Sequence, residues 1–377
     1  MNITVIGAGA WGTALAISLA ANHRVTLWGR DAVQIAEMQT SRRNQRYLPD
    51  IWLPDYLELG SDFSAALATA ELAIIAVPTA ALRSTLQQFA SRFPLSNSLG
   101  ETTSHSTRMP KTAAKSLVIP QAGRAQRGGR SRTNEKGIVK FPGVVWVCKG
   151  FEAKTSLLPH QVVAEVLPEG CKCAVLSGPS FAQEVARSLP TALTLASSDE
   201  EFARGTAQAL HHARLRVYAS SDVIGVEVGG AVKNVMAIAS GICDGMGLGQ
   251  NARAALITRG LAEITRLGLK LGGRPETLGG LSGLGDLILT CTGDMSRNRQ
   301  VGLLLAQQQD LTMILNKLGH VAEGVYTVLE VHNLAQRLGV AMPICDAVYR
   351  ILYDNMPAAE MVAELLNRTP NLEFNGG

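Results

Sequence analysis

The sequence predicts an α/β domain with a doubly wound parallel sheet, followed by an all-α C-terminal domain. From Asn2 to about Tyr218, short apolar runs alternate with segments of helical periodicity, as in parallel strands joined by crossover helices. After about Ser220 the strand-like runs end and long Ala-, Leu- and Gly-rich segments follow. Because 377 residues are too many for one ordinary core, we expect two domains, 1–219 and 220–377.

The expected elements follow from the apolar periodicity. The strands are residues 3–6, 25–28, 72–77, 144–148, 174–177, 191–196 and 215–218. The helices between them include 12–21, 66–70, 82–89 and 200–210. The second domain is expected to contain helices at 222–243, 251–271, 298–308 and 323–338. Strands separated by helices favour parallel pairing throughout the sheet.

Residues 94–141 interrupt this pattern. The stretch is rich in Ser, Thr, Arg and Gly and has little periodicity, so we expect a disordered or outward-looping insertion. Residues 96–137 carry a net charge of +6, and without them the chain's formal charge of +4 becomes −2. The basic character therefore belongs to one segment, which favours neither nucleic acid nor a membrane as partner, although a functional basic segment remains an alternative.

Composition limits the class of protein. The charged fraction of 18% beside 46% hydrophobic residues excludes a disordered chain. Six cysteines are scattered without a disulfide framework, and Cys171 and Cys173 lack the second pair of a zinc site, so no metal is expected. The chain starts directly with a strand pattern and has no apolar run of about 18 residues, so we expect a cytoplasmic protein without membrane insertion.

The first strand leads into a glycine-rich loop, Gly7-Ala8-Gly9-Ala10-Trp11-Gly12. In a Rossmann-type βαβ unit the first glycine allows a tight turn, the second lets a pyrophosphate approach the backbone, and the third lets helix and strand pack closely. The helix N-terminus then offers free N–H groups to phosphate. A lone GxGxxG is a weak signal, but here the strand, the helix and a second strand all follow in order, which indicates dinucleotide binding.

The end of the second strand bears on the choice of cofactor. NAD-selective sites commonly hold the ribose hydroxyls with an acidic residue there. This chain has Gly29 and Arg30, with Asp31 one position later. A guanidinium can pair with a 2′-phosphate, so we expect NADP, or both NADP and NAD, unless Arg30 is only a solvated surface residue.

Two lysines are candidates for polarising a substrate carbonyl and supplying a proton. Lys149 follows the expected strand 144–148, at the edge of the sheet where ligands bind. Lys233 lies within an almost wholly apolar helix, where a charge is costly unless it is paired or functional. The alternative for each is a buried stem with an ammonium that reaches solvent.

Motifs along nearly the whole chain resemble the bacterial-type NAD(P)-dependent glycerol-3-phosphate dehydrogenases. They are GAGAWGTALA (7–16), LWGRD (27–31), AVPT (76–79), CKG (148–150), LSGPSFAQEVA (176–186), GGAVKNVMAI (229–238), GLGDLILTCT (283–292) and SRNRQVG (296–302). The resemblance implies reduction of dihydroxyacetone phosphate to sn-glycerol 3-phosphate, which supplies phospholipid synthesis.

The resemblance also implies roles for individual residues. Lys233 would be the general acid and base, and Lys149 would contact both substrate and cofactor. The other implied substrate-binding residues are Gly178, Ser180, Asn234, Asp286, Thr290, Ser296, Arg297 and Asn298. With Lys149, the expected cofactor-binding residues are Gly7, Gly9, Ala10, Trp11, Gly12, Arg30, Ala182, Arg297, Val321 and Glu323. Asp286 and Ser180 have helix capping as alternatives, and residues 296–299 could form a plain surface turn.

The chain departs from the family pattern between Pro78 and Lys149, where seventy residues exceed what the family needs. Three interpretations stay open for these extra residues: a surface loop that the fold tolerates, a feature specific to one lineage, or an anomaly of the sequence such as a translated non-coding element. Rival functions are other two-domain reductases acting on 3-hydroxyacids, ketopantoate or nucleotide sugars, a non-catalytic NADP sensor, and nucleic-acid binding through the insertion. The lysine pair argues against a sensor. A homodimer is left open.

Overall fold

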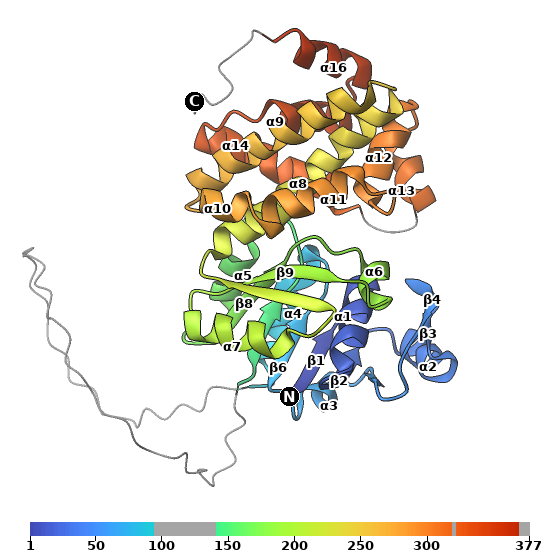
Figure 1. Ribbon diagram of the computed structural model, residues 1–377, viewed down its shortest axis with the longest axis vertical. Coiled ribbons are helices and arrows are strands. Elements are labelled where there is room, and N and C mark those ends of the chain that lie inside the picture. Colours follow the sequence, from blue (N-terminus) through green and yellow to red (C-terminus); the bar gives the residue numbers. More distant parts are fainter. Residues whose placement is uncertain (94–140, 319–321, 369–377) are drawn as a thin grey trace, which may run out of the picture. The chain divides into compact units, whose positions relative to one another are not determined.

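The computed structural model describes residues 1–93, 141–318 and 322–368 (Figure 1). By its internal contacts, one compact unit comprises residues 1–92 together with the chain from Phe141 onwards. The insertion expected at 94–141 lies outside the described residues except for Phe141, so its conformation stays a prediction. Within the compact unit, the strands precede the long helices, as the sequence predicts.

The described residues of the N-terminal part form an eight-stranded sheet of order β10-β9-β8-β7-β6-β1-β2-β5. Its strands are β1 (Asn2–Ile6), β2 (Arg24–Trp28), β5 (Glu58–Gly60), β6 (Leu72–Ile75), β7 (Gly143–Trp146), β8 (Cys173–Ser177), β9 (Thr191–Ala196) and β10 (Leu215–Ser220). The order runs outward from β1 in both directions, which makes the β1–β6 boundary the switch point of a doubly wound sheet. The predicted fold class is confirmed, with one difference in strand direction.

That difference is at β9. The pair β8–β9 is antiparallel, whereas β9–β10 and the remaining pairs of the sheet are parallel. The expectation of parallel pairing throughout was therefore wrong for this edge. Alternation of strand and helix predicts a crossover, but the short helix α6 (Ala182–Ala186) returns the chain without the full crossover that a parallel strand needs.

The helices of the N-terminal part cover the sheet. They are α1 (Ala10–Ala20), α2 (Ala32–Ser41), α3 (Phe63–Leu67), α4 (Thr79–Ala90), α5 (Pro159–Val166), α6 and α7 (Glu200–Leu210). The sequence did not predict α2 or the hairpin of β3 (Arg43–Asn44) and β4 (Leu48–Trp52). β3 has only two residues, and the apolar residues of β4 are interrupted by Pro49 and Asp50, so neither strand has the continuous apolar run by which a buried strand is recognised.

Every secondary-structure element described in the C-terminal part is a helix. Its helices are α8 (Val223–Gly245), α9 (Gly249–Lys270), α10 (Pro275–Leu278), the π-helix η1 (Leu281–Gly285), α11 (Asp286–Thr292), α12 (Arg297–Ala306), α13 (Leu311–Leu318), α14 (Glu323–Leu338), α15 (Pro343–Tyr353) and α16 (Ala358–Leu366). Figure 1 shows α8 surrounded by the other helices. The cluster of buried side chains in this part includes many from α8.

Helix α8 is long and apolar enough to cross a membrane by length and composition, alone among the helices of the described chain. However, 89% of its most apolar window is buried inside the protein. The apolar surface of α8 is therefore used to build the core of the helical part. A few polar residues interrupt that core, among them Glu227, Lys233 and Asn234.

Glu227 attaches α8 to the sheet. One of its carboxylate oxygens accepts hydrogen bonds from Trp146 Nε1 on β7 (2.8 Å) and from the backbone N–H of His160 (2.9 Å). The other oxygen lies 2.5 Å from His160 Nδ1. Burial raises the pKa of the Glu227 carboxyl, and these contacts oppose that rise. A carboxylate with several donors therefore links β7 to the central helix, which sets the position of the residues that follow on α8.

Candidate active site

Three charged side chains from different segments meet in the interior. Lys233 Nζ on α8 lies 2.5 Å from Asp286 Oδ1, and Lys149 Nζ, after β7, lies 2.6 Å from Asp286 Oδ2. Asp286 is 1% exposed, and the side chains of Lys233 and Lys149 are 9% and 15% exposed. One buried carboxylate therefore holds two ammonium groups that the sequence separates by more than eighty residues. This arrangement rules out the alternatives that Asp286 only caps a helix and that both lysines reach solvent.

Lys233 has a second partner in Thr290, whose Oγ1 accepts from Nζ at 3.0 Å. The pKa of Lys233 is lowered to about 8, mainly by burial; Asp286 opposes this shift, and the neighbouring Lys149 adds to it. Because a lysine ammonium has three N–H donors, one remains for a ligand. A pKa near neutrality suits a group that gives and takes protons in each turnover.

Small residues allow the segments around Lys233 to approach so closely. A Cβ on Gly229 would lie 2.6 Å from the carbonyl oxygen of Ser282 in η1, and one on Gly230 would lie 2.8 Å from Ser177 Oγ on β8. Gly283, in η1, packs its Cα against the backbone of Leu278. Asp286 begins α11 directly after η1, so this contact between α8 and η1 determines how far Asp286 stands from Lys233.

The loop after β7 holds Lys149. Gly150 has φ +123°, a conformation that favours glycine, and a Cβ there would lie 3.1 Å from Thr327 Oγ1 and 3.6 Å from Thr79 Oγ1. Thr79 Oγ1 donates to the carbonyl of Lys149 at 3.0 Å. Further along, the buried Glu330 of α14 accepts from Lys154 N at 2.9 Å and from Ser156 Oγ at 2.6 Å. The loop is thereby attached to both halves of the protein.

A second polar group lies where α8, α12 and α14 meet. Asn298 Nδ2 donates to Asn234 Oδ1 at 3.0 Å, and Asn298 Oδ1 accepts from the backbone N–H of Gly324 at 3.0 Å. Arg297 is exposed beside this pair, and Glu323 is the first residue of α14. Burial raises the pKa of Glu323, while the charges of Arg297, Lys149 and Lys233 oppose the rise. The guanidinium of Arg297 and the ammonium groups of both lysines therefore all lie near enough to Glu323 to stabilise its charged form.

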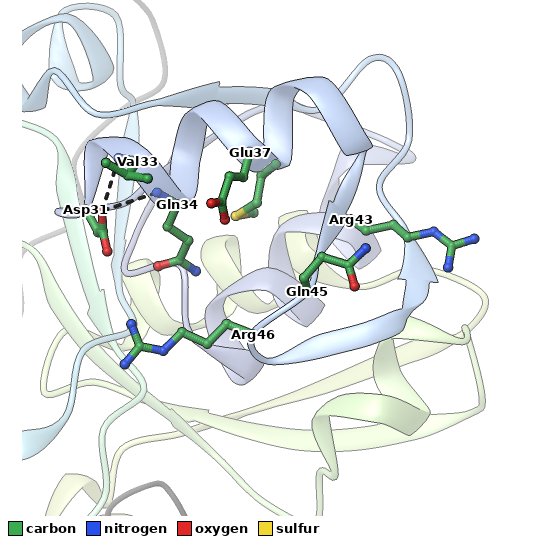
Figure 2. A pocket seen from close by; sticks show the side chains of 8 residues that line it. Asp31, Val33, Gln34, Glu37, Arg43, Gln45 and Arg46 are labelled. Carbon is green, nitrogen blue, oxygen red and sulfur yellow. Dashed lines mark hydrogen bonds between the residues drawn. The ribbon is translucent and has the colours of Figure 1, made fainter.

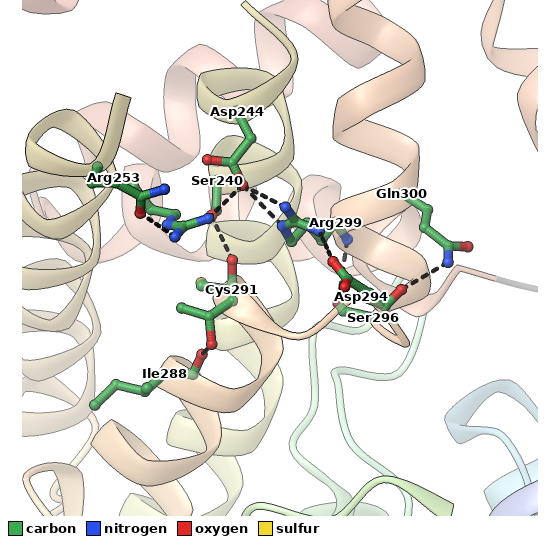
Figure 3. A network of polar contacts seen from close by, with 11 residues as sticks. Ser240, Asp244, Arg253, Ile288, Cys291, Asp294, Ser296, Arg299 and Gln300 are labelled. Carbon is green, nitrogen blue, oxygen red and sulfur yellow. Dashed lines mark hydrogen bonds and ion pairs between the residues drawn. The ribbon is translucent and has the colours of Figure 1, made fainter. Parts of the chain in front are cut away.

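The turn that carries Arg297 is fixed by an ion-pair network (Figure 3). Arg299 donates to Asp244 Oδ2 through Nε (2.9 Å) and Nη2 (2.7 Å), and Nη1 reaches Asp294 at 3.0 Å. Arg253 contacts the same Asp244 oxygen at 3.0 Å. Ser296 caps α12 by accepting from Arg299 N at 3.3 Å. Residues 296–299 are thus a rigid helix start, not a plain surface turn.

The glycine-rich loop has the geometry for a dinucleotide. Gly7 has φ +121° and packs against the carbonyl of Ala76, and Gly12 packs against the carbonyl of Gly7. By contrast, a Cβ on Gly9 would have nothing within 4 Å among the described residues. Gly9 is the N-cap of α1, and no described side chain caps that helix. Open space above uncapped N–H groups fits a pyrophosphate.

The sequence did not single out Asn44 of β3, which braces this loop. Its side chain is completely buried, and Nδ2 donates to the Ala8 carbonyl (3.0 Å) and to Thr13 Oγ1 (2.8 Å). Gln34 Nε2 donates to the same Ala8 carbonyl at 3.1 Å and to Asn44 Oδ1 at 3.2 Å. Only the tertiary contact between hairpin and loop reveals this role, because a lone asparagine in a polar stretch carries no such signal.

Arg30 and Asp31 follow β2. Arg30 is exposed, and Asp31 is the N-cap of α2, where it accepts from the N–H groups of Val33 and Gln34. Gly29 packs tightly against Ile35 and Ala8. Its lack of a side chain therefore lets α2 pack closely on the strand end, in addition to leaving room beside Arg30.

A pocket of about 150 Å³ adjoins this strand end (Figure 2). It is lined by Asp31, Val33, Gln34, Glu37, Met38, Arg43, Gln45 and Arg46. Arginines from the β3–β4 hairpin therefore share this region with Asp31 and Glu37 of the second βα turn.

Comparison with known proteins decides the family. A model of the C-terminus of NAD-dependent glycerol-3-phosphate dehydrogenase matches residues 222–363, and a model of the N-terminus matches residues 2–103 and 113–203. This chain belongs to the NAD-dependent glycerol-3-phosphate dehydrogenase family. The fold and family expectations of the sequence are thereby confirmed.

Relatives of this family match over the whole chain. The glycerol-3-phosphate dehydrogenase [NAD(P)+] of Thiobacillus denitrificans is 54% identical over 99% of this chain and 100% of its own length. That of Nitrosomonas eutropha is 52% identical over 99% of both chains. The crystal structure of the Coxiella burnetii enzyme superposes with a TM-score of 0.81 at 39% identity, covering 97% of this chain and 99% of that one.

Five residues expected from the family resemblance come together around one carboxylate. Lys149, Lys233, Asp286 and Thr290 form one group, and Gly178 joins it because its carbonyl lies 3.2 Å from Lys149 Nζ. Ser180 is not a helix cap, since its Oγ donates to Gly178 O at 3.0 Å and α6 is capped at Phe181. Ala182 is the first residue of α6. It packs against the core of the N-terminal part, and Ala10 and Trp11 of α1 pack against the same core. Val321 lies outside the described residues.

Replacing Asn44 tests the brace of the glycine-rich loop. We expect Asn44→Ala to raise the Kd for NADPH about tenfold or more, because the Ala8 carbonyl and its neighbouring N–H groups lose their fixed orientation; tenfold corresponds to about 1.4 kcal/mol. Fluorescence titration of NADPH binding measures this directly, alongside Tm.

Two further variants serve as comparisons. Thr13→Ala keeps the contact between Asn44 and Ala8 and should weaken NADPH less, and the exposed Asn22→Ala should change nothing. A lower Tm for Asn44→Ala with unchanged NADPH affinity would show a purely structural role.

Proposed function

We propose that this protein interconverts dihydroxyacetone phosphate and sn-glycerol 3-phosphate by hydride transfer with NAD(P)H. The observation that carries the proposal is the buried carboxylate of Asp286 shared by Lys149 and Lys233. With both lysines protonated, these three groups carry a net charge of +1 at a largely buried site, which favours a developing oxyanion. Family membership is consistent with this chemistry.

In the proposed mechanism Lys233 donates a hydrogen bond to the carbonyl oxygen of the substrate. NAD(P)H, held at the glycine-rich loop, would supply the hydride for the carbonyl carbon. As negative charge develops on the oxygen, Lys233 transfers a proton to it, and in the reverse reaction the neutral amine accepts that proton. Asp286 and Thr290 orient the amine, while Lys149 adds a fixed positive charge beside it.

The substrate phosphate is assigned to the segment at the start of α12. Arg297 is the exposed cation there, Asn298 and Asn234 supply amide groups, and Ser296 caps the helix whose N-terminus faces the same region. An arginine held by a rigid turn suits a dianion, because its guanidinium can donate two parallel hydrogen bonds. Gly178 and Ser180 line the sheet side of the same site.

The cofactor is assigned to the glycine-rich loop, with Gly7, Gly9, Ala10, Trp11 and Gly12 along the pyrophosphate and Arg30 at the ribose. Ala182, Arg297, Glu323 and Val321 complete the proposed cofactor contacts. Either NADP or NAD is accepted in this proposal, with Arg30 favouring NADP. We further propose that the product supplies phospholipid synthesis in the cytoplasm. In this proposal residues 1–219 and 220–377 are the two domains.

A substrate panel tests the proposed reaction. Purified protein should oxidise NADPH with dihydroxyacetone phosphate and show little turnover with ketopantoate or short 3-keto acids, because only the phosphorylated ketone uses Arg297. Absorbance of NADPH gives the rates. Faster turnover of a keto acid than of dihydroxyacetone phosphate would contradict the assignment.

Lys233→Ala tests the acid and base. We expect kcat to fall by about 10²–10⁴, the usual contribution of a positioned proton donor, while NADPH still binds. The exposed Lys270→Ala is the matched control and should keep wild-type rates. Near-normal reduction of dihydroxyacetone phosphate by Lys233→Ala would remove this assignment.

The wild-type enzyme offers a pH test of the same residue. With the pKa of Lys233 at about 8, kcat/KM for ketone reduction should fall as the pH rises through that value, since the ammonium is the required form. For oxidation of glycerol 3-phosphate, kcat/KM should instead rise with pH and level off above it.

Arg30→Ala tests cofactor choice. The variant should weaken NADPH much more than NADH, because only NADPH carries the 2′-phosphate that a guanidinium would pair with. Arg204→Ala, an exposed arginine on α7, is the control. Equal losses for both cofactors would mean that Arg30 does not contact the 2′-phosphate.

A further inference from the structure

Two cysteines that take no part in the proposed reaction face each other at the start of β8. The Sγ atoms of Cys171 and Cys173 are 3.3 Å apart, and both side chains are partly exposed. In an extended segment, residues two positions apart point to the same face, which explains the approach of the two thiols. Among the described residues no third side chain joins them to form a metal site.

The backbone on both sides holds this pair in place. Before it, Gly170 has φ +81° and the Cys171 N–H donates to the Pro168 carbonyl at 3.2 Å, which closes a turn. After it, the carbonyl of Cys173 accepts from Ser197 Oγ at 2.6 Å. The backbone positions from which the two thiols approach each other are therefore set by the fold.

The other cysteines of the chain are poor candidates for the same chemistry. Cys148, Cys243, Cys291 and Cys345 are buried. Burial raises the pKa of each of these thiols, that of Cys291 to about 12, so they stay protonated and unreactive. At Cys171, by contrast, the hydrogen bond from Cys173 lowers the thiol pKa.

We propose that Cys171 and Cys173 are a redox-modification site, a dithiol that closes to an intrachain disulfide by exchange with a small disulfide such as oxidised glutathione. The Cys171 thiolate attacks one sulfur of glutathione disulfide, a mixed disulfide forms, and one glutathione leaves as thiolate. Cys173 loses its proton and attacks the Cys171 sulfur, and the second glutathione leaves. The protein loses two electrons and two protons, and one glutathione disulfide becomes two glutathione molecules.

The site is independent of the proposed dehydrogenase reaction. Cys173 is the first residue of β8, whereas Gly178, which contacts Lys149, follows the last residue of that strand. Ligands of doubly wound sheets bind at the carboxyl ends of the strands, so the dithiol lies at the opposite end of β8 from the lysines. Its test accordingly uses a chemical readout and not enzyme activity.

The sequence provides a direct assay, because Lys172 separates the two cysteines. Reduced full-length protein is incubated with glutathione disulfide without denaturant, free thiols are alkylated, and the chain is digested with trypsin without reductant. Cleavage after Lys172 separates peptides 155–172 and 173–187 unless a disulfide joins them. We expect the joined pair, and an intact mass lower by two hydrogens.

Matched variants make the result decisive. Cys171→Ser and Cys173→Ser should abolish the joined pair and stop at a single glutathione adduct or at no adduct, while Cys243→Ser should form the pair as the wild type does. The proposal is overturned if the native wild type keeps both thiols alkylated or stops at a mixed disulfide. It is also overturned if the protein unfolded in urea forms the pair as fast as the native protein does, because the folded arrangement would then contribute nothing.

Discussion

The carboxylate of Asp286 is the interaction on which the rest of the site depends. It accepts Lys233 from the helical part and Lys149 from the loop after β7, and it is almost completely buried. Two ammonium groups so close together repel each other, and burial removes the water that would screen them. Without this anion the interior would hold uncompensated charge, which costs several kcal/mol in measured cases. The carboxylate thus joins the two halves of the chain while keeping both cations available.

Close backbone packing makes this arrangement possible. Gly229 admits the π-helix η1 and Gly230 admits Ser177 at the end of β8, so α8 approaches both without intervening side chains. A π-helix at a functional site is a recurrent feature of proteins, since it shifts the residues that follow it. Here Asp286 follows η1 directly. Glu227 and Glu330 then tie α8 and α14 to the sheet side through buried hydrogen bonds, which limits relative movement of the groups around the lysines.

Much of the fold was predictable because its signals are local. The apolar runs of β1, β6, β7 and β8 are buried on both faces, and such runs are visible in the sequence. The direction of β9 and the hairpin β3–β4 were not predictable. Strand direction depends on where the chain returns, and β3 and β4 are too short and too interrupted to give a continuous apolar run. Asn44 belongs to this second class. Its role exists only because the hairpin folds back over the glycine-rich loop.

The sequence by itself determined the dinucleotide loop, the order of strands before helices, and the two lysines, because each rests on residue type and spacing along the chain. Gly7, Gly9 and Gly12 could be assigned separate tasks from the geometry of a βαβ turn alone. The tertiary structure decided which of these groups meet. Lys149 and Lys233 share one carboxylate, and α8 comes into backbone contact with η1. Both contacts arise from packing between segments far apart in the sequence, and no local sequence pattern predicts them.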